Sequence, residues 1–445
     1  MTLPRSPALA LALAFLAALT ACGSPPDLPP EGAVEGWDGA LLVLADGDMA
    51  ATAYADGELH PVEGGADVLL AVSPADGTIG ARAAVPNTVM GWPGSMTVAP
   101  GGVAYVVSGR GTPAPGTARY DDIYTEFPFA KTLSAVDMAD GRTIARIDVC
   151  TRPQSVDRAA SGRFLLVACG DDGGELAVVP LDGQGLPGAP RAFNLDVTPP
   201  EGAARDRGAS FAVMHPGGRA AGVVLKNRAV TLVRFAMDED GVPVRAEAET
   251  PSPAAPGRWL SVARWTRGGG HLLAADVGWG PAPLDAVLNG DGAIVSYALS
   301  PDDEVRGEAG AATVSKSPEA FEANAEGDLL AVVNMERTYL PGGFTALFRG
   351  RDASSLSLVA VDPETGALRT LGAPLPFRGV LPEDAAFDGD GDRVAVAVYQ
   401  DHDAPRSDGW LAYFAVEGAG DDRRLRAMPV RTRLPRGAHD LERMK

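Results

Sequence analysis

One pattern recurs along the chain and limits what the chain can fold into. It consists of a proline or glycine, a short strand of mixed character, a turn with glycine or aspartate, and a strongly apolar strand. A repeat of this length indicates one supersecondary unit that is used many times. Six copies are found: Pro93–Gly102 with Val103–Val107, Pro153–Ala160 with Phe164–Ala168, Gly208–His215 with Ala220–Leu225, Arg258–Trp265 with His271–Val277, Pro318–Ala325 with Leu329–Val333, and Pro382–Phe387 with Val394–Val398.

A second hairpin fills several of the intervals between these copies. The clearest examples are Val68–Ala84, Leu133–Val149 and Leu356–Leu371. Short apolar or alternating runs that are broken by turn residues predict strands, and two hairpins make a four-stranded antiparallel sheet. The 54 glycines and 37 prolines suit a chain with many turns. We therefore expect an all-β protein.

Repeated four-stranded sheets predict a β-propeller, because a ring of blades protects the edges that an open sheet would expose. A seventh inner strand, Pro435–Leu441, has no strand after it. If it pairs with the N-terminal strands Ala40–Ala45 and Met49–Ala55, one blade is completed from both ends and the ring has seven blades. If Ala40–Ala45 is itself an inner strand, the ring has eight. In either case residues 38–445 are expected to form a single propeller domain.

The repeats resemble those of the YVTN and lactonase-type seven-bladed propellers. The resemblance rests on the proline-containing start, on the Asp-Gly-Asp-Gly-Asp turn at Asp388–Asp392, and on the strand end Val361–Gly366. It covers most of Val68–Lys445 as a pattern. It implies the seven-bladed fold and one enzymatic hypothesis, the hydrolysis of a cyclic ester by carboxylates, histidine and arginine at the mouth of the channel.

No catalytic residue of that family can be matched to this chain one by one, and the fold hosts many unrelated activities. Catalytic residues therefore stay unassigned. The first three to test are His439, Asp384 and Glu322.

The N-terminal residues predict export. Residues 1–21 contain Arg5 and then an apolar run, Ala8–Leu19, which is too short to span a bilayer and has the length of a signal-peptide core. The sequence Leu-Thr-Ala-Cys that ends at Cys22 resembles the lipobox of bacterial lipoproteins, which implies that Cys22 is lipidated. The alternative is an ordinary secretory signal with a chance cysteine.

Residues 22–37 are expected to be the lipidated cysteine and a proline-rich linker. Gly23 stands where an aspartate would retain many such lipoproteins in the inner membrane. The resemblance therefore implies a lipid-anchored protein of the cell envelope, in the outer membrane, facing the periplasm or the cell surface.

Two further cysteines, Cys150 and Cys169, form an even pair in an oxidising compartment. Such a pair predicts a disulfide. The alternative is two buried free thiols.

The longest connections of the predicted propeller all follow the second strand of a blade, so they gather on one face. Long loops on a rigid scaffold are where binding usually resides, and aromatic and arginine side chains are favoured as anchors. Alternatively, these side chains fold back and plug the loops onto the ring. The candidate ligand-binding residues are Tyr120, Tyr124, Phe127, Trp279, Arg337, Tyr339, Phe344, Phe348 and His402.

Polar residues near the start of the inner strands are expected to line the central channel. A ring of acids with one histidine can bind a cation or act in acid–base chemistry. The alternative is a solvated polar channel. The candidates are Asp157, Ser210, Arg258, Glu319, Glu322, Asp384 and His439.

Charge and composition exclude several partners. The formal net charge of −20 makes nucleic acid an unfavourable partner. The five histidines are scattered, and the turn Asp388–Asp392 lacks the final glutamate of an EF-hand loop, so no metal site is expected. No motif for haem, phosphate or a dinucleotide occurs in a fitting context, so no cofactor is expected.

These observations favour a lipid-anchored envelope propeller that binds a small-molecule ligand or a partner protein through its long loops. Two alternatives stay open. One is a lactonase-like hydrolase with its site in the channel, on the same side as the loops. The other is a scaffold subunit of an envelope complex.

Overall fold

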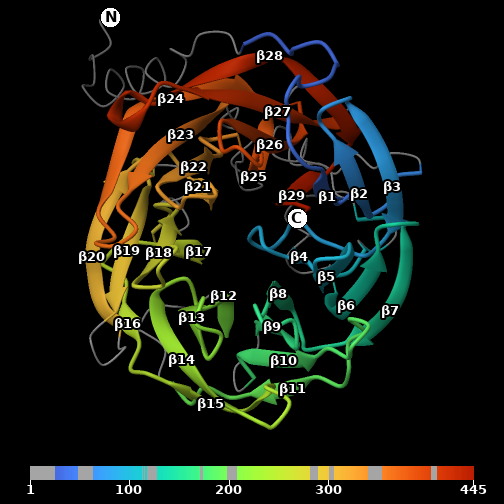
Figure 1. Cartoon of the computed structure of the whole chain (residues 1–445), viewed down its shortest axis with the longest axis vertical. Coiled ribbons are helices and arrows are strands. Elements are labelled where there is room, and N and C mark those ends of the chain that lie inside the picture. Colours follow the sequence, from blue (N-terminus) through green and yellow to red (C-terminus); the bar gives the residue numbers. More distant parts are fainter. Residues whose placement is uncertain are drawn as a thin grey trace, which may run out of the picture.

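Seven small sheets stand around a central axis in the computed structural model of the chain (Figure 1). The structure describes residues 26–48, 64–112, 114, 116–117, 128–170, 174–197, 208–280, 289–299, 305–338, 353–401 and 408–444. The signal segment and Cys22 lie outside these residues. Among the described residues, helix is confined to one 3-10 turn, Gly420–Asp422, and no helix is long and apolar enough to cross a membrane.

Six blades form in chain order, each from four consecutive strands. The first three are β4 (Met96–Val98), β5 (Val103–Arg110), β6 (Phe129–Asp137) and β7 (Arg142–Asp148); β8 (Pro153–Arg158), β9 (Phe164–Cys169), β10 (Leu176–Pro180) and β11 (Arg191–Phe193); and β12 (Ala209–Met214), β13 (Ala220–Leu225), β14 (Ala229–Met237) and β15 (Pro243–Ala248), with β16 (Ser252–Pro253) beside β14. The fourth blade consists of β17 (Leu260–Trp265), β18 (His271–Asp276), β19 (Ala293–Leu299) and β20 (Val305–Thr313). The fifth consists of β21 (Pro318–Ala323), β22 (Leu329–Asn334), β23 (Ala353–Val361) and β24 (Leu368–Arg378). The sixth consists of β25 (Val380–Phe387), β26 (Arg393–Gln400), β27 (Asp408–Glu417) and β28 (Arg424–Pro435).

The seventh blade joins the two ends of the chain. Its inner strand is the last strand, β29 (Ala438–Arg443), and its outer strands are β1 (Leu41–Ala45), β2 (Val68–Ser73) and β3 (Thr78–Ala84). Leu41 pairs with Arg443 on one side and with Val72 on the other. The predicted closure through the strand at Ala40–Ala45 and the number seven are therefore confirmed, whereas Met49–Ala55, also expected to be a strand of this blade, lies outside the described residues. The eight-bladed alternative is wrong, because β1 is a second strand and not an inner one.

The apolar content of the strands explains their order within a blade. All residues of β9 and β22 are buried, because a second strand is covered by neighbouring blades on both faces. The outermost strand β7 has no buried residue. Between the last two blades formed in chain order, Trp410 and Phe414 pack with Leu329 and Val396 in one apolar cluster.

The inner strands share an irregularity. In six of the seven blades the pairing between the first and second strands shifts register near the start of the inner strand, which is the mark of a β-bulge. Because the side-chain period of a strand is two, a bulge changes which residues face the channel after it. The residues passed over at the shifts are Gln154, Ser210, Ser261 and Val262, Glu319, Glu383 and Asp384, and His439.

The two ends of the ring differ. We call the end that carries the short turns after the inner strands the turn face; these turns are 99–102, 159–163, 215–219, 266–270, 324–328 and 388–392. We call the opposite end, where the connections after the second strands begin, the loop face. The carboxyl ends of all seven inner strands point to the turn face.

Candidate functional site

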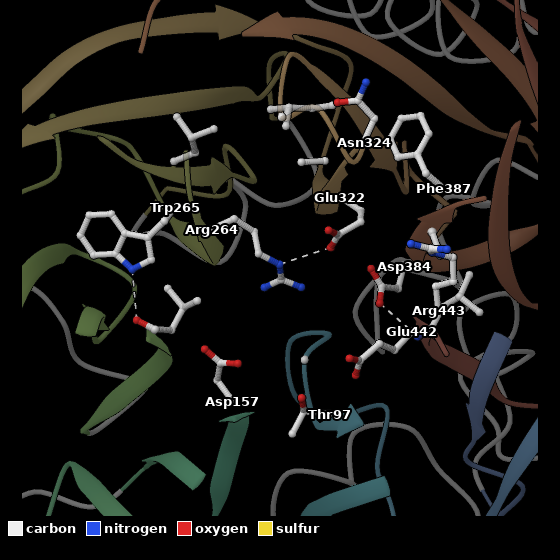
Figure 2. A pocket seen from close by; sticks show the side chains of 18 of the residues that line it. Thr97, Asp157, Arg264, Trp265, Glu322, Asn324, Asp384, Phe387, Glu442 and Arg443 are labelled. Carbon is white, nitrogen blue, oxygen red and sulfur yellow. Dashed lines mark hydrogen bonds and ion pairs between the residues drawn. The ribbon is translucent and has the colours of Figure 1, made fainter. Parts of the chain in front are cut away.

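A cavity of about 420 Å³ occupies the channel at its turn-face end. It takes lining residues from all seven blades, and Figure 2 shows the polar side chains that point into it. One position of each inner strand contributes a ring of seven residues. The ring consists of Thr97, Asp157, Val213, Arg264, Glu322, Ala386 and Glu442.

These seven residues are structurally equivalent. Each lies two positions before a residue whose backbone N–H donates to the chain beyond the turn; for example, Ala159 N–H bonds Phe164 O and Thr266 N–H bonds His271 O. The same bond from Met444 N–H to Ala40 O extends the rule to the closing blade. The turn, and not the start of the strand, therefore fixes which residue faces the cavity.

Arg264 is the cation of this ring. Its Nε donates to Glu322 Oε2 at 3.3 Å, and its Nη1 donates to Ala263 O at 3.1 Å. Burial alone would lower the pKa of Arg264, but the carboxylates of Glu322, Asp384 and Asp157 raise it above its ordinary value. The guanidinium is therefore a permanent positive charge among acidic neighbours, as Figure 2 shows.

Two carboxyl groups of the cavity hold protons more tightly than usual. Burial raises the pKa of Glu442 to about 8, and the nearby Asp440 adds to the effect. Burial, and again Asp440, raise the pKa of Asp384 well above its ordinary value, against the opposing charge of Arg264. Both carboxyls can therefore act as proton donors near neutral pH.

The remaining wall is apolar and fixed in place. Trp265 donates its indole N–H to Val213 O at 3.2 Å, and the His215 ring packs edge-on against it at 4.8 Å. Phe211 lies under the Arg264 guanidinium at 5.5 Å, and Phe387 lines the side of the cavity opposite Trp265 (Figure 2). A preformed cavity of this size with a few convergent polar groups suits a small-molecule ligand.

Comparison with known proteins bears on the fold. No protein-family model matches the sequence, and no curated protein does. Among solved structures, a candidate 6-phosphogluconolactonase from Bacteroides fragilis is 12% identical, with a TM-score of 0.60 over 92% of this chain and 99% of that one. A second, from Bacteroides uniformis, is 13% identical with a TM-score of 0.56, over 91% of this chain and 99% of that one. The periplasmic gluconolactonase PpgL of Pseudomonas aeruginosa is 18% identical, with a TM-score of 0.56 over 91% of this chain and 98% of that one.

This chain has the seven-bladed propeller fold of those lactonases. At these identities the likeness concerns the fold alone. Activity has to be argued from the cavity.

The predicted channel residues fall into two groups. Asp157, Glu322 and Asp384 line the cavity, together with Arg264 and Glu442, which sequence reasoning missed. Ser210, Glu319 and His439 lie at the bulges instead, buried away from the cavity.

His439 illustrates the second group. Its Nε2 is 2.9 Å from Asn87 Oδ1, and burial lowers the pKa of the imidazole to about 4. It is thus held as a neutral ring away from Asp384 and Glu322.

The expectation that Arg258 lines the channel is wrong. Its Nη1 donates to Asp276 Oδ2 at 2.8 Å, and its guanidinium also bonds the carboxylate of Glu308 on the outer strand β20. Arg258 precedes β17, and its guanidinium is held by the second and fourth strands of its own blade. Counting from the start of the repeat placed it in the channel, whereas the chain enters the inner strand only at Leu260.

The loop face carries two of the predicted ligand-binding residues. Trp279 donates its indole N–H to Ser317 Oγ at 3.1 Å and packs against Trp92, with the two rings tilted by 46° and their centres 5.7 Å apart. Arg337 Nη2 donates to Asn289 O at 3.0 Å. Outside the described residues lie Tyr120, Tyr124, Phe127, Tyr339, Phe344, Phe348 and His402.

The Trp92–Trp279 contact joins distant blades. Trp92 precedes β4, whereas Trp279 follows β18 on the far side of the ring, so residues 85–95 reach across the loop-face end of the channel. This placement differs from the expectation of a channel site beside the long loops. The cavity opens at the turn face, on the other side of the ring.

Cys150 and Cys169 are joined by a disulfide on the loop face. Cys150 lies in the connection that leads into β8, the inner strand of the second blade in chain order, and Cys169 ends β9, the second strand of that blade. The bond ties the entry of this blade to its most buried strand.

A group of three acids also lies at the loop face. Carboxylate oxygens of Asp46, Asp48 and Asp67 lie within 4.8 Å of one another, a spacing that could hold a cation. The buried Arg436 already supplies positive charge beside Asp46 and Asp48. Burial lowers the pKa of Arg436, and the negative charges of both aspartates oppose this effect. The sequence did not reveal this group, because Asp67 is separated from the other two by a long connection.

Proposed function

We propose that this protein hydrolyses a cyclic ester, of the size of a sugar-acid lactone, in the turn-face cavity. The observation that carries the proposal is the position of Arg264 in a 420 Å³ cavity, paired with Glu322 and surrounded by carboxyl groups. The lactonases that share the fold support the choice of substrate class.

The roles follow from the charges. The Glu322 carboxylate takes a proton from a water molecule, whose oxygen attacks the carbonyl carbon of the lactone. Arg264 donates hydrogen bonds to the oxyanion that forms, because its charge is permanent. The ring C–O bond then breaks, and the leaving alkoxide takes the proton of Glu442, whose pKa is raised to about 8. The proton held by Glu322 then passes through water to Glu442, so that both carboxyl groups regain their starting states. One water is consumed, and the product is an open hydroxy acid.

The test is the hydrolysis of glucono-δ-lactone, followed by proton release and compared with the spontaneous rate. Glu322→Gln and Glu442→Gln should each lower kcat/KM by about 100-fold or more, which is the usual contribution of an acid–base group. Glu417→Gln is the matched control, since Glu417 pairs with Arg424 and Arg426 at the surface, outside the cavity. Wild-type protein that does not exceed the spontaneous rate on this or related lactones would refute the proposal.

The setting of this activity is also a proposal. The lipobox-like sequence supports anchoring through Cys22 in the cell envelope, in the outer membrane facing the periplasm or the cell surface. Hydrolysis would then take place outside the cytoplasm.

A second function, binding of an envelope protein at the loop face, is favoured by one observation. Phe129 is 51% exposed at the start of β6, and the guanidiniums of Arg110 and Arg152 lie 4.5 and 5.4 Å from its ring centre. An exposed aromatic ring with two arginine side chains close to it suits an interface anchor. Phe129→Ala should then reduce the capture of a partner from detergent-solubilised envelopes, with Ile79→Ala on β3 as the control for another exposed apolar side chain.

A further inference from the structure

We infer that the protein meets a phospholipid bilayer with the outer rim of its sixth blade, next to the closing blade, and that both ends of the ring open to the aqueous side. The partner of this rim is the headgroup layer of the membrane. The inference rests on the anchoring at Cys22 proposed above and goes beyond it, because a lipid anchor alone does not determine which side of a protein faces the membrane.

The linker that precedes the propeller is bound to this rim. Arg431 of β28 donates its N–H to Pro30 O at 3.0 Å and accepts the N–H of Gly32 at 3.1 Å on its carbonyl oxygen, so the linker lies beside the outer strand of the sixth blade as one residue of added parallel strand. The Arg431 guanidinium also donates to Pro29 O at 3.0 Å and to Glu31 Oε1 at 3.1 Å. Figure 1 shows this blue segment at the rim beside β28.

Contacts on either side hold the linker in place. Leu28 packs against the apolar cluster of Trp410 and Phe414 between the fifth and sixth blades. Val34 donates its N–H to Pro74 O at 2.8 Å, in the turn before β3 of the closing blade. The linker would have to break these contacts to swing away from the ring. The point at which the tether leaves the ring is therefore fixed near Leu28.

The remaining tether is short compared with the ring. Leu28 lies six positions after Cys22, and six residues span at most about 20 Å when fully extended. A domain of about 400 residues is about 50 Å across by the usual scaling of size with chain length. A lipid on Cys22 therefore holds the rim at Leu28 close to the bilayer and keeps the blades on the far side of the ring away from it.

The outer strands beside the tether suit a headgroup layer. β28 and β3 contain five arginines and no acidic residue, whereas β7, β15 and β20 contain one acidic residue each. Glu417, Glu31 and Asp408 pair with four of these arginines, so the rim is close to neutral in a chain of net charge −20. An anionic bilayer repels the more acidic sides of the molecule. Ile79 on β3, 41% exposed, adds an apolar side chain that the interface can cover.

This placement has a consequence for the proposed activity. The turn face and the loop face are the two ends of the ring, so neither is covered when the rim faces the bilayer. A soluble lactone then reaches the turn-face cavity from the aqueous side, while the loop face stays open to a partner.

The experiment places the same environment-sensitive fluorophore at four exposed positions of the full chain, one variant at a time. The lipidated protein is bound to vesicles of phosphatidylethanolamine and phosphatidylglycerol that contain brominated lipid as a quencher. Ile79→Cys lies on β3 beside the tether, and Val244→Cys, 52% exposed on β15, is its matched control across the ring (Figure 1). Asp390→Cys reports on the turn face and Phe129→Cys on the loop face.

The fluorophore reacts with the introduced cysteine alone, because lipidation consumes the thiol of Cys22 and the other two cysteines are bonded to each other. We expect brominated lipid to quench the label at Ile79→Cys and its emission to shift to the blue, while the other three labels keep the emission that they show without vesicles. Quenching at any of those three positions that equals or exceeds quenching at Ile79→Cys would overturn the inference.

A second tether separates this inference from the proposed anchoring. If mass spectrometry finds Cys22 without lipid, the anchoring fails. A hexahistidine segment in place of Cys22 then holds the same four variants on vesicles that contain a nickel-chelating lipid. Preferential quenching at Ile79→Cys would still support the placement of the rim by the linker, and equal quenching at all four positions would overturn it.

Discussion

Asp440 Oδ2 accepts a hydrogen bond of 2.8 Å from the hydroxyl of Ser95, which lies 345 residues earlier in the chain. The same oxygen accepts the N–H of Gly94 at 3.1 Å. The contact ties the last strand, β29, to the entry of β4 in the next blade. Asp384, at the equivalent position of β25, accepts the N–H of Leu441 at 3.0 Å. Buried acceptors of this kind hold neighbouring inner strands together.

Loss of the Asp440 acceptor should destabilise the ring. Asp440→Ala leaves a buried N–H and a buried hydroxyl without a partner, which costs about 1–3 kcal/mol per unsatisfied group. Asp440→Asn keeps one acceptor oxygen and should cost less. Urea unfolding of both variants measures the difference, and an alanine variant as stable as the wild type would contradict the role given to this contact.

Removal of the disulfide should lower stability by a similar amount. Cys150 and Cys169 are 19 residues apart, and a loop of this length contributes about 3 kcal/mol on the chain-entropy estimate. The double variant Cys150→Ala, Cys169→Ala should therefore unfold at a lower urea concentration. Reductant should lower the urea midpoint of the wild type to that of the double variant and leave the midpoint of the double variant unchanged. If reductant does not change the urea midpoint of the wild type, the disulfide does not contribute to stability.

Arg264 should matter more for turnover than for folding. Arg264→Met removes the charge that faces Glu322, Asp384 and Asp157, and the loss of an oxyanion donor typically lowers kcat by about 100- to 1,000-fold. Arg264→Lys keeps the charge without the fork of donors and should retain part of the rate. Circular dichroism monitors folding, and full activity of the methionine variant would remove Arg264 from the mechanism.

Stability should fall as the pH rises from about 5.5 to about 8. Burial raises the pKa of Asp67 to about 7 and that of Glu442 to about 8, so above the pKa of an unfolded carboxyl the folded state binds more protons. His439 opposes this trend, because its folded pKa is about 4 and its unfolded ring is protonated below about 6.5. Thermal unfolding at both pH values tests the balance. Glu442→Gln should flatten the dependence, whereas Glu417→Gln should not.

The anchor predicted at Cys22 can be tested in cells. Cys22→Ser removes the thiol that is lipidated in lipoproteins, so the protein should move from the membrane fraction to the soluble fraction. Substitution of Ser24, two residues later in the linker, is the control. A protein that stays soluble with Cys22 intact would leave only an ordinary secretory signal.

The fold could be predicted because the sequence features that indicate it, the apolar strands and their turns, each lie within a short segment of the chain. Each apolar strand is bounded by glycine and aspartate turns, and the unpaired strand at the C-terminus implied the closure that Leu41 and Arg443 make. Asp157 and Glu322 were among the polar residues that were expected to line the channel from the start of the inner strands, and the cavity confirms that they line it, although they lie nearer the turn.

Arg264 and Glu442 were missed because a β-bulge leaves no clear trace in the sequence. The candidates were counted forward from the start of each repeat, and the bulge shifts that count, as it did for His439. Counting back from the turn gives the correct register in every blade. That signal was available at Thr266, two residues after Arg264, where the turn begins.

The closing blade depends on a pairing between two strands that lie far apart in the sequence, β29 and β1. Without Ala438–Arg443, β1 has an open edge of five apolar residues, Leu41–Ala45, that lacks its inner neighbour. An unpaired apolar edge is a template for aggregation. Loss of β29 therefore exposes an apolar strand edge that is covered in the closed ring, so ring closure also protects the molecule against aggregation.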